Sequence, residues 1–374
     1  MDWRQEKKFS QYLRLRSVPH ICPLLADVGL YANRPRTARV YSAQMRAVII
    51  TRPGGPEGLE IREIEKPRPG PGEVLVRVHA SALNRADVLQ RQGRYPAPAG
   101  APQDIPGLEF AGEVAALGER AARWRAGQRV FGITAGGAHA EYLVSHERML
   151  AEVPDNLSWS EAAAIPEAFI TAHDALWKQA ELAARETALI HAAGSGVGLA
   201  AIQLVRAKGA IPYGTSRTAD KLQRARQYGL EDGVALSGDL QAMAQKVQHW
   251  AQGAGLNVIL DLVGGDYFPA NVEALASRGR LLLVGTVAGV KTEVALGTIL
   301  RKRLKIIGTV LRGRSLEEKI AVTEAFSKEV LPLFAKGDLR PVIDSEFAVS
   351  QVQEAHQRME SNESFGKIIL RIAA

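Results

Sequence analysis

The sequence predicts an α/β fold with two domains, one β-rich and the other a doubly wound parallel sheet with helices on both faces. Short strand patterns separated by Gly and Pro fill residues 45–155, and helical patterns alternate with apolar strands over residues 165–308. The length of 374 residues is sufficient for two domains with sizeable cores. A glycine turn between a strand and a helix also predicts a phosphate-binding sheet edge in the second region.

In the first region, residues 73–80 alternate between apolar and polar with period two, directly after a run of Pro and Gly at 67–72. Prolines between 96 and 106 exclude a helix there. Further strands are expected at 45–50, 108–116, 129–134 and 140–145.

In the second region the expected strands are almost entirely apolar, as in a parallel sheet buried on both faces. They cover residues 187–192, 210–214, 258–263, 281–284 and 304–308. Capping boxes at Ser158 and Ser315 predict helix starts, and Ser350 is expected to begin one more helix. The chain then ends with a strand at 366–372, and the strand at 304–308 is a candidate edge strand for pairing across a two-fold axis.

Composition excludes several classes of protein. Hydrophobic residues make up 46% and charged residues 23%, which argues against disorder, collagen and coiled coil. The one cysteine, Cys22, excludes a disulfide framework and a cysteine-rich zinc lobe. The net charge of +7 raises the question of a nucleic acid or membrane partner. However, residues 1–44 carry eight Arg or Lys and three Asp or Glu, whereas the rest of the chain has 39 basic and 37 acidic residues.

Three interpretations of the basic extension, residues 1–44, stay open. The start site is annotated too far upstream and Met45 is the true start, or the segment is a solvated tail, or it is a mitochondrial presequence, against which Asp2 and Glu6 count. No apolar core of a secretory signal follows the first basic residues, and no run of 18 apolar residues exists. We therefore expect a cytoplasmic protein without a membrane partner.

The glycine turn carries the clearest chemistry. A strand at 187–192 is followed by Ala193-Gly194-Ser195-Gly196-Val197-Gly198 and a helix through Lys208. Glycine lets backbone N–H groups approach a pyrophosphate, and the helix N-terminus adds partial positive charge. Ala193 and Ser195 occupy the first two glycine places of the usual fingerprint, so a tight turn without a ligand is the alternative.

Several segments together resemble the medium-chain dehydrogenase/reductase superfamily, specifically the zeta-crystallin-like quinone oxidoreductases. They are residues 52–57, 81–87, 90–95, 106–112, the glycine turn, 284–286 and 366–370. The resemblance covers about 45–374. It implies a GroES-like catalytic domain at 45–165 and 309–374, a Rossmann cofactor domain at 166–308, and a homodimer.

The expected cofactor is NADPH. An NAD-binding sheet places an acidic residue about 20 positions past the glycine turn, but here the second strand ends in Gly214-Thr215-Ser216. Ser216, Arg217 and Lys221 would instead bind a 2′-phosphate, to which Arg offers a fork and Lys a point charge. The resemblance implies the same cofactor. Asp220 is the competing candidate, although it falls inside the expected next helix.

No metal is expected. In zinc-dependent relatives the metal is held by Cys, His and Cys, and the resemblance puts Asn84, Leu108 and Glu167 at those three places. Asp87 and Glu109 flank the lost site and look like retained acidic neighbours. A Lewis-acid route is therefore not predicted.

Without a metal the acceptor must be easily reduced, and the resemblance implies hydride transfer from the nicotinamide to a quinone. It also implies that Asn84 faces the nicotinamide ribose, that Tyr95 lines the quinone pocket, and that Ser195 contacts cofactor and substrate. Their alternative roles are a turn cap, a loop anchor and a small turn residue. The remaining expected cofactor contacts are Thr171, Gly194, Gly196, Val197, Gly198, Ser216, Arg217, Lys221, Val263, Gly264, Gly285, Thr286, Gly366 and Lys367.

Two competing functions stay open. An enoyl or α,β-unsaturated carbonyl reductase would keep the fold and the cofactor, and its enolate would also need a proton. A non-enzymatic nucleic-acid binder on the same fold is less expected, because most of the basic excess lies in residues 1–44. There is no HExxH or GxSxG motif, and His173 is expected to be structural.

Overall fold

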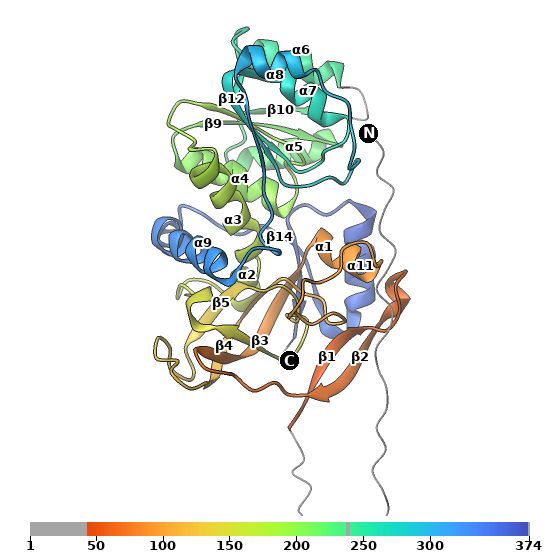
Figure 1. Ribbon diagram of the computed structural model, residues 1–374, viewed down its shortest axis with the longest axis vertical. Helices are drawn as coiled ribbons and strands as arrows, with labels where there is room; N and C mark the ends of the chain where they lie inside the picture. The colour runs from red at the N-terminus through yellow and green to blue at the C-terminus, as the bar shows by residue number, and fades with distance from the viewer. Residues whose placement is uncertain (1–42, 237–239, 373–374) are drawn as a thin grey trace, which may run out of the picture. The chain divides into compact units, whose positions relative to one another are not determined.

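The computed structural model describes residues 43–236 and 240–372, which belong to one compact unit, residues Ser42–Ala374 (Figure 1). The predictions for the N-terminal extension, including Cys22, lie outside the described residues. The described part contains two large sheets, one mixed and one parallel. No described helix has the length and apolar character that crossing a membrane requires.

The first large sheet combines strands from both ends of the described chain. Its path is β14-β15-β3-β4-β5-β7, and β6 also pairs with β3. β15, near the C-terminus, runs antiparallel to β3, so the return segment completes the β-rich part. The strands are β3 (Glu73–Leu83), β4 (Glu109–Leu117), β5 (Arg129–Ile133), β6 (Tyr142–His146), β7 (Leu150–Glu152), β14 (Ile343–Ala348) and β15 (Lys367–Arg371), beside a hairpin of β1 (Gln44–Ile50) and β2 (Leu59–Glu65).

The second sheet is parallel throughout its described pairings and has the order β10-β9-β8-β11-β12-β13. The chain runs outward from β8 through β9 to β10, then crosses to the other side of β8 and continues outward through β11, β12 and β13. β8 is therefore at the topological switch point, where ligands bind in such sheets. The strands are β8 (Thr187–Ile190), β9 (Ile211–Ser216), β10 (Asp232–Ala235), β11 (Leu256–Asp261), β12 (Leu275–Leu283) and β13 (Lys305–Gly308).

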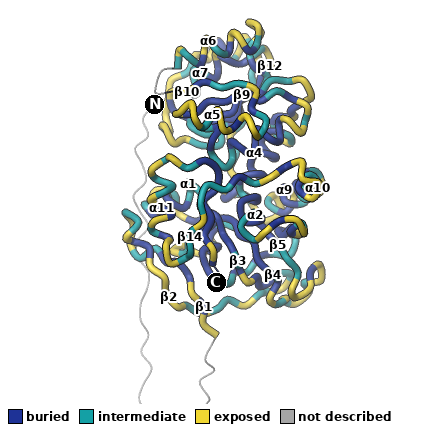
Figure 2. Tube along the Cα trace, turned by 180° about the vertical axis from the view of Figure 1, so that it is seen from behind, coloured by how far each residue is buried: buried dark blue, intermediate teal, exposed yellow. Residues whose placement is uncertain are grey.

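Helices cover both faces of the parallel sheet. Ile190 belongs to the core formed with α3 (Pro166–His173), α4 (Gly196–Ala207) and α5 (Ala219–Ala225), whereas Leu189 packs with α6 (Gln241–Trp250) and α7 (Tyr267–Ala274). The core on the α4 face continues to Phe131 and Phe326 of the β-rich part, and Figure 2 shows the buried centre of both sheets. The other helices are α1 (Arg85–Arg91), α2 (Trp159–Ala163), α8 (Leu296–Lys302), α9 (Leu316–Glu329), α10 (Leu331–Lys336) and α11 (Val352–Ser361).

Most local predictions are confirmed. The Ser158 and Ser315 hydroxyls accept hydrogen bonds from the N–H groups of Glu161 and Glu318, as capping boxes require. The start at Ser350 is wrong. A short 3-10 turn precedes α11, and Gln351 reaches back to accept the N–H of Ala348 at 3.2 Å, so the longer amide side chain performs the capping.

Candidate active site

The glycine turn connects β8 to α4 at the switch point. Ser195 precedes the first helical residue, and its Oγ accepts the N–H of Gly198 at 3.0 Å. The first turn of this twelve-residue helix carries no acidic side chain. The positive end of the helix is therefore not neutralised locally, which suits an anion such as a pyrophosphate.

Close backbone packing explains the glycine at 198. A Cβ there would lie 2.4 Å from the carbonyl oxygen of Ala192, which itself adopts φ 50°. A Cβ on Gly194 would lie 3.0 Å from Cδ of Lys221. The glycines thus leave the backbone of the turn without side chains on the side where Lys221 reaches it. Such a turn can accommodate a phosphate-bearing cofactor. Val197, expected among the contacts, lies in the first turn of α4.

The carboxyl ends of β11 and β12 bring four predicted cofactor contacts together. Asp261 Oδ1 accepts the N–H groups of Val263 and Gly264 at 2.8 and 2.9 Å. A Cβ on Gly264 would lie 2.9 Å from Cα of Thr286, the residue after Gly285. Asp261 shapes this edge, although the sequence patterns did not single it out.

A series of buried, hydrogen-bonded polar side chains supports the same sheet edge. Asp261 Oδ2 accepts the Asn271 amide at 3.1 Å, and Asn271 Oδ1 lies 2.7 Å from His191 Nε2. His191 Nδ1 lies 2.8 Å from Thr215 Oγ1 at the end of β9. Burial lowers the pKa of His191, so its ring stays neutral and serves as a bridge.

The cations predicted to recognise a 2′-phosphate meet at one backbone carbonyl. Arg217 Nη2 and Lys221 Nζ donate to the carbonyl of Asn362 at 2.9 and 2.7 Å. Arg85, which the sequence patterns did not single out, donates to the side-chain oxygen of Asn362 at 2.5 Å. Burial lowers the pKa of Lys221 and of Arg85, and in both cases the nearby Arg217 charge lowers it further.

Among the described residues, no carboxylate forms an ion pair with Arg85, Arg217 or Lys221. The positive charge of this cluster is therefore not balanced by an ion pair. Asp220 lies inside α5 and pairs with Arg224 of the same helix at 3.6 Å. Ser216 ends β9 and is almost fully buried. The arrangement favours an anion over a neutral hydroxyl.

A second cluster joins β15 to the lost metal position. Lys367 Nζ lies 2.6 Å from Glu109 Oε1 and 2.7 Å from Asn84 Oδ1, and it also donates to the carbonyl of Leu83. Asn84 Nδ2 donates to Glu109 Oε1 at 2.8 Å. Glu109 is fully buried. Asn84 is the N-cap residue of α1 and forms a capping box with Asp87, and its side chain is also held in one orientation by an acid and a base.

This cluster touches the glycine turn. The N–H of Gly366 donates to the carbonyl of Gly194 at 3.0 Å, and Ser195 and Gly366 form an isolated bridge. A Cβ on Gly196 would lie 2.4 Å from Cδ of Lys367. Sequence segments far apart, around Asn84, the turn and Lys367, are thus brought to one place.

The residues at the lost metal position do not fit a zinc ion. Leu108 offers no donor atom, and the Lys367 ammonium already occupies Asn84 Oδ1 and Glu109 Oε1. In residues 43–236 and 240–372, no group of three or more His, Cys, Asp or Glu could hold a metal ion. Zinc independence stays a prediction from the sequence.

The charge of Arg312 acts on both Tyr95 and Glu167. Arg312 donates to the carbonyl of Tyr95 at 3.2 Å, stacks over its ring at 5.1 Å, and donates to Gln90 Oε1 at 2.6 Å. Burial raises the pKa of Tyr95, so its hydroxyl keeps its proton. Arg312 was missed because it lies 217 residues from Tyr95 in the chain.

Glu167 follows Pro166 at the start of α3, and its N–H donates to Glu109 Oε2 at 2.8 Å. Burial, and then the charge of Glu109, raise the pKa of its carboxyl to about 8. Thr171 lies further along α3 and is mostly buried. Within the described residues, the Tyr95 ring packs against Arg312, and no hydrogen bond or ring contact joins it to Asn84 or Ser195.

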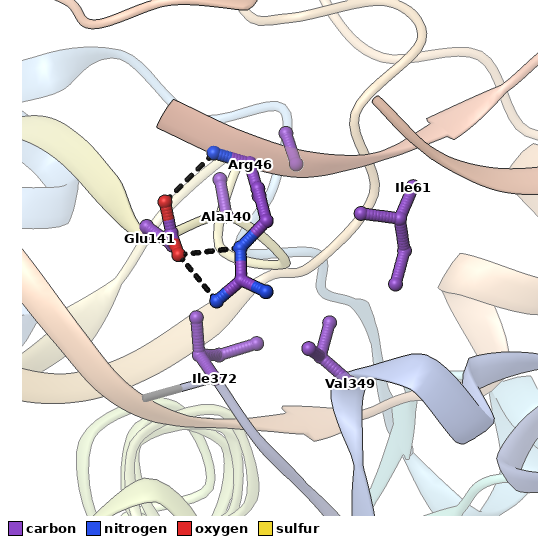
Figure 3. A pocket seen from close by; sticks show the side chains of 7 residues that line it. Arg46, Ile61, Ala140, Glu141, Val349 and Ile372 are labelled. Carbon is purple, nitrogen blue, oxygen red and sulfur yellow. Dashed lines mark hydrogen bonds and ion pairs between the residues drawn. The ribbon is translucent and has the colours of Figure 1, made fainter. Parts of the chain in front are cut away.

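The small pocket in Figure 3 shares no residue with these clusters. It has a volume of about 10 Å³ and is lined by Arg46, Ala47, Ile61, Ala140, Glu141, Val349 and Ile372. Arg46 and Glu141 pair on its wall, with Arg46 Nε and Nη2 at 2.8 and 2.7 Å from Glu141 Oε1. Such a volume holds at most about one water molecule.

The family models that match this chain cover the same two regions. The alcohol dehydrogenase GroES-like domain matches residues 70–155, and the zinc-binding dehydrogenase domain matches residues 196–328. A quinone oxidoreductase from Pseudomonas aeruginosa is 35% identical over 318 residues, 85% of this chain and 96% of the relative. The chain belongs to the quinone oxidoreductase family of the medium-chain dehydrogenases/reductases. It is therefore an oxidoreductase, and the family implies a nicotinamide cofactor.

Other relatives agree with this family. The human quinone oxidoreductase is 30% identical over 87% of this chain and 97% of its own length. The solved structure of a Pseudomonas syringae quinone oxidoreductase has a TM-score of 0.79 at 29% identity, covering 87% of this chain and 99% of that one. A mycobacterial structure determined with NADPH has a TM-score of 0.76 at 26% identity, with 87% and 99% covered. The predicted GroES-like and Rossmann architecture is thereby confirmed.

Proposed function

We propose that this member of the family is a zinc-independent, NADPH-dependent quinone oxidoreductase, with its catalytic domain at 45–165 and 309–374 and its cofactor domain at 166–308. The observation that carries the cofactor assignment is the cluster of Arg217, Lys221 and Arg85 around Asn362, which has no carboxylate partner among the described residues. The names of the similar proteins support a quinone acceptor, and the mycobacterial relative with NADPH bound supports the cofactor.

Each cluster has a distinct task in this proposal. The glycine turn and the start of α4 bind the pyrophosphate through backbone N–H groups, and Ser216, Arg217 and Lys221 bind the 2′-phosphate. Lys367 and Glu109 fix the orientation of Asn84 so that it can position the nicotinamide ribose.

The bound cofactor supplies the hydride, and the chain supplies position and excludes water. Arg312 holds Tyr95 so that its ring and hydroxyl can orient the acceptor. In this proposal Ser195, the N-cap residue of α4, contacts both cofactor and acceptor.

A second candidate function is reduction of an enoyl thioester or another α,β-unsaturated carbonyl compound. The carboxyl of Glu167, with its pKa of about 8, favours it, because an enolate needs a proton. Solved enoyl reductases at 24% identity show the same fold only. Loss of NADPH in the presence of quinones or of enoyl thioesters separates the two candidates.

Replacing Arg217 and Lys221 tests the cofactor assignment. Arg217→Ala and Lys221→Ala each remove a charge-assisted hydrogen bond worth about 1.5–3 kcal/mol, which is about 10–150-fold in affinity. Fluorescence titration should show weaker NADPH binding and little change for NADH, and Lys336→Ala at an exposed position should change neither. Equal affinity of the wild-type protein for NADH and NADPH would contradict the assignment.

We also propose that the protein is a homodimer formed through β13, the edge strand of the parallel sheet. Apolar side chains are exposed on and beside this strand, with exposed fractions of 38% for Ile306, 52% for Val310 and 78% for Leu300. An unpaired apolar edge favours pairing with a second copy across a two-fold axis. The cytoplasmic location stays a prediction from the sequence.

A charge on the edge strand tests the dimer. Ile306→Lys should convert a wild-type dimer into a monomer in sedimentation velocity, because two lysines would face each other across the axis. The matched control is Ile61→Lys on β2, since Ile61 is also 38% exposed. A wild-type protein with the mass of one chain would contradict the proposal.

A further inference from the structure

The carboxyl of Glu167 differs from the other acids around the lost metal position. Both oxygens of Asp87 accept backbone N–H groups, from Asn84 and Gly107 at 2.8 Å each. Both oxygens of Glu109 are also in use, one by Lys367 and Asn84 and the other by the N–H of Glu167. Among the described residues, none donates to the half-buried Glu167 carboxyl and none forms an ion pair with it. Of these three acids, Glu167 is the one whose carboxyl remains available to a ligand.

Its surroundings favour the protonated form. Burial is the largest cause of its raised pKa of about 8, and the negative charges of Glu109 and Asp87 add to it. The positive charges of Lys367 and Arg312 oppose the shift without cancelling it. The charged and titratable groups that act on this site come from several elements. They are Asp87 on α1, Tyr95 in its loop, Glu109 on β4, Arg312 after β13, Lys319 on α9 and Lys367 on β15.

Glu167 also connects the two halves of the site. Its backbone is bonded to Glu109, which holds Asn84 on the cofactor side. Its charge acts on Tyr95 and Arg312, which are on the acceptor side. Glu167 is thus linked both to the groups expected to position the hydride donor and to those expected to hold the acceptor.

We propose that Glu167 is the general acid that protonates the acceptor once it has received the hydride, an assignment that rests on the proposed function. The hydride brings two electrons and leaves a negative charge on an acceptor oxygen. The O–H bond of Glu167 breaks, its proton bonds to that oxygen, or to the α-carbon of an enolate, and the carboxylate regains a proton from water. The positive charges of Arg312 and Lys319 act on Glu167 and would stabilise the carboxylate once its proton has left.

The other candidate donors are less suited to this step. The Lys367 ammonium has three acceptors, the oxygens of Leu83, Asn84 and Glu109, so its protons are engaged. Burial raises the pKa of the Tyr95 hydroxyl, which makes it a weaker acid. Glu167 alone among these groups combines an unengaged proton with a pKa near neutrality.

The first test reads the proton directly, without turnover. Difference infrared spectroscopy of the whole protein should show a carboxylic acid band at pH 7 that disappears as the pH rises through about 8. The band should be absent in Glu167→Gln and present in Glu354→Gln, a control at an exposed glutamate. A Glu167 that is already ionised at pH 7 overturns the proposal.

The pH dependence of the stability of the folded protein provides a second test. Because the pKa of Glu167 is higher in the folded state than the ordinary value of 4.5, the folded protein binds an extra proton between about pH 4.5 and 8. Its stability should therefore fall as the pH rises through this range, and Glu167→Gln should remove that loss. A melting temperature difference between the variant and the wild type that stays constant from pH 5 to 9 contradicts the proposal.

Kinetics complete the test. Glu167→Gln should lower acceptor turnover about 10²–10⁴-fold, remove the decline of the rate above pH 8, and leave NADPH affinity unchanged. Glu167→Asp, which keeps an acid, should recover part of the rate. Full turnover and an unchanged pH profile in Glu167→Gln overturn the role of Glu167 while the proposed function stands. A wild-type protein that reduces neither quinones nor enoyl compounds overturns the proposed function itself.

Discussion

The glycine turn and the cluster around Lys367 touch each other, yet their polar groups are satisfied in opposite ways. In the turn, the N-terminus of α4 has no acidic side chain in its first turn and its glycines keep the backbone bare. In the cluster, a fully buried Glu109 and an almost fully buried Lys367 engage each other and Asn84. The first region is built to receive an anion, and the second is built to hold a side chain still.

The two regions also differ in how the sequence encodes them. The turn is one continuous run from Ala192 to Gly198, so its chemistry follows from local rules about strands, glycines and helix starts. The cluster takes Asn84 from the N-cap of α1, directly after β3, and one residue each from β4, α3 and β15. Its chemistry depends on which of these segments meet.

Breaking the cluster should have the largest effect on stability. Lys367→Met leaves the Glu109 carboxylate buried without its cation, which costs about 3–5 kcal/mol of unfolding free energy. Urea unfolding should show this loss. The double variant with Glu109→Gln should recover most of it, because an uncharged amide needs no counterion.

An exposed ion pair provides the matched control. Arg62 and Glu60 pair at 2.9 Å on the surface, where such contacts contribute about 0–1 kcal/mol. Arg62→Met should therefore barely change the unfolding free energy. If Lys367→Met costs no more than Arg62→Met, then the Glu109 charge is not closed off from water and the contrast between the two regions is wrong.

The sequence predicted the fold where one segment carries its own pattern. The strand expected at 187–192 is present as β8, which ends two residues earlier at Ile190, and the capping boxes at Ser158 and Ser315 are present. β12 starts at Leu275, six positions before the expected 281, because Ser277, Arg278 and Arg280 interrupt the apolar run. β14 was not expected, since its residues Ile343–Ala348 are neither continuously apolar nor buried.

For the site, the sequence named the components but not their pairings. Asn84, Glu109 and Lys367 were each singled out, whereas their mutual hydrogen bonds depend on β3, β4 and β15 being neighbours. Glu167 was noted only as occupying a lost ligand position. Its raised pKa comes from burial and from Glu109, which lies 58 residues away. Long-range charge and burial are properties of the folded chain, so local patterns do not contain them.

Changing the turn should have a smaller effect on stability and a larger relative effect on binding. Gly198→Ala places a Cβ 2.4 Å from the carbonyl oxygen of Ala192, a backbone atom that can yield only if the turn moves. Overpacking of this kind costs about 1–3 kcal/mol. Because the same backbone forms the anion-binding end of α4, NADPH affinity in fluorescence titration should fall at least about tenfold, the equivalent of 1.4 kcal/mol.

Gly297→Ala is the control, since a Cβ there has no atom within 4 Å and the residue lies in the exposed first turn of α8. It should leave NADPH affinity unchanged and should not lower stability, because Ala in place of Gly in a helix stabilises by up to about 1 kcal/mol. Comparing Gly198→Ala with Lys367→Met then distinguishes the two regions by their losses of NADPH affinity and of unfolding free energy. We expect the turn variant to lose both NADPH affinity and stability, and the charge-pair variant to lose mainly stability. Equal losses in both measurements for both variants would mean that the turn and the cluster act as one structural unit.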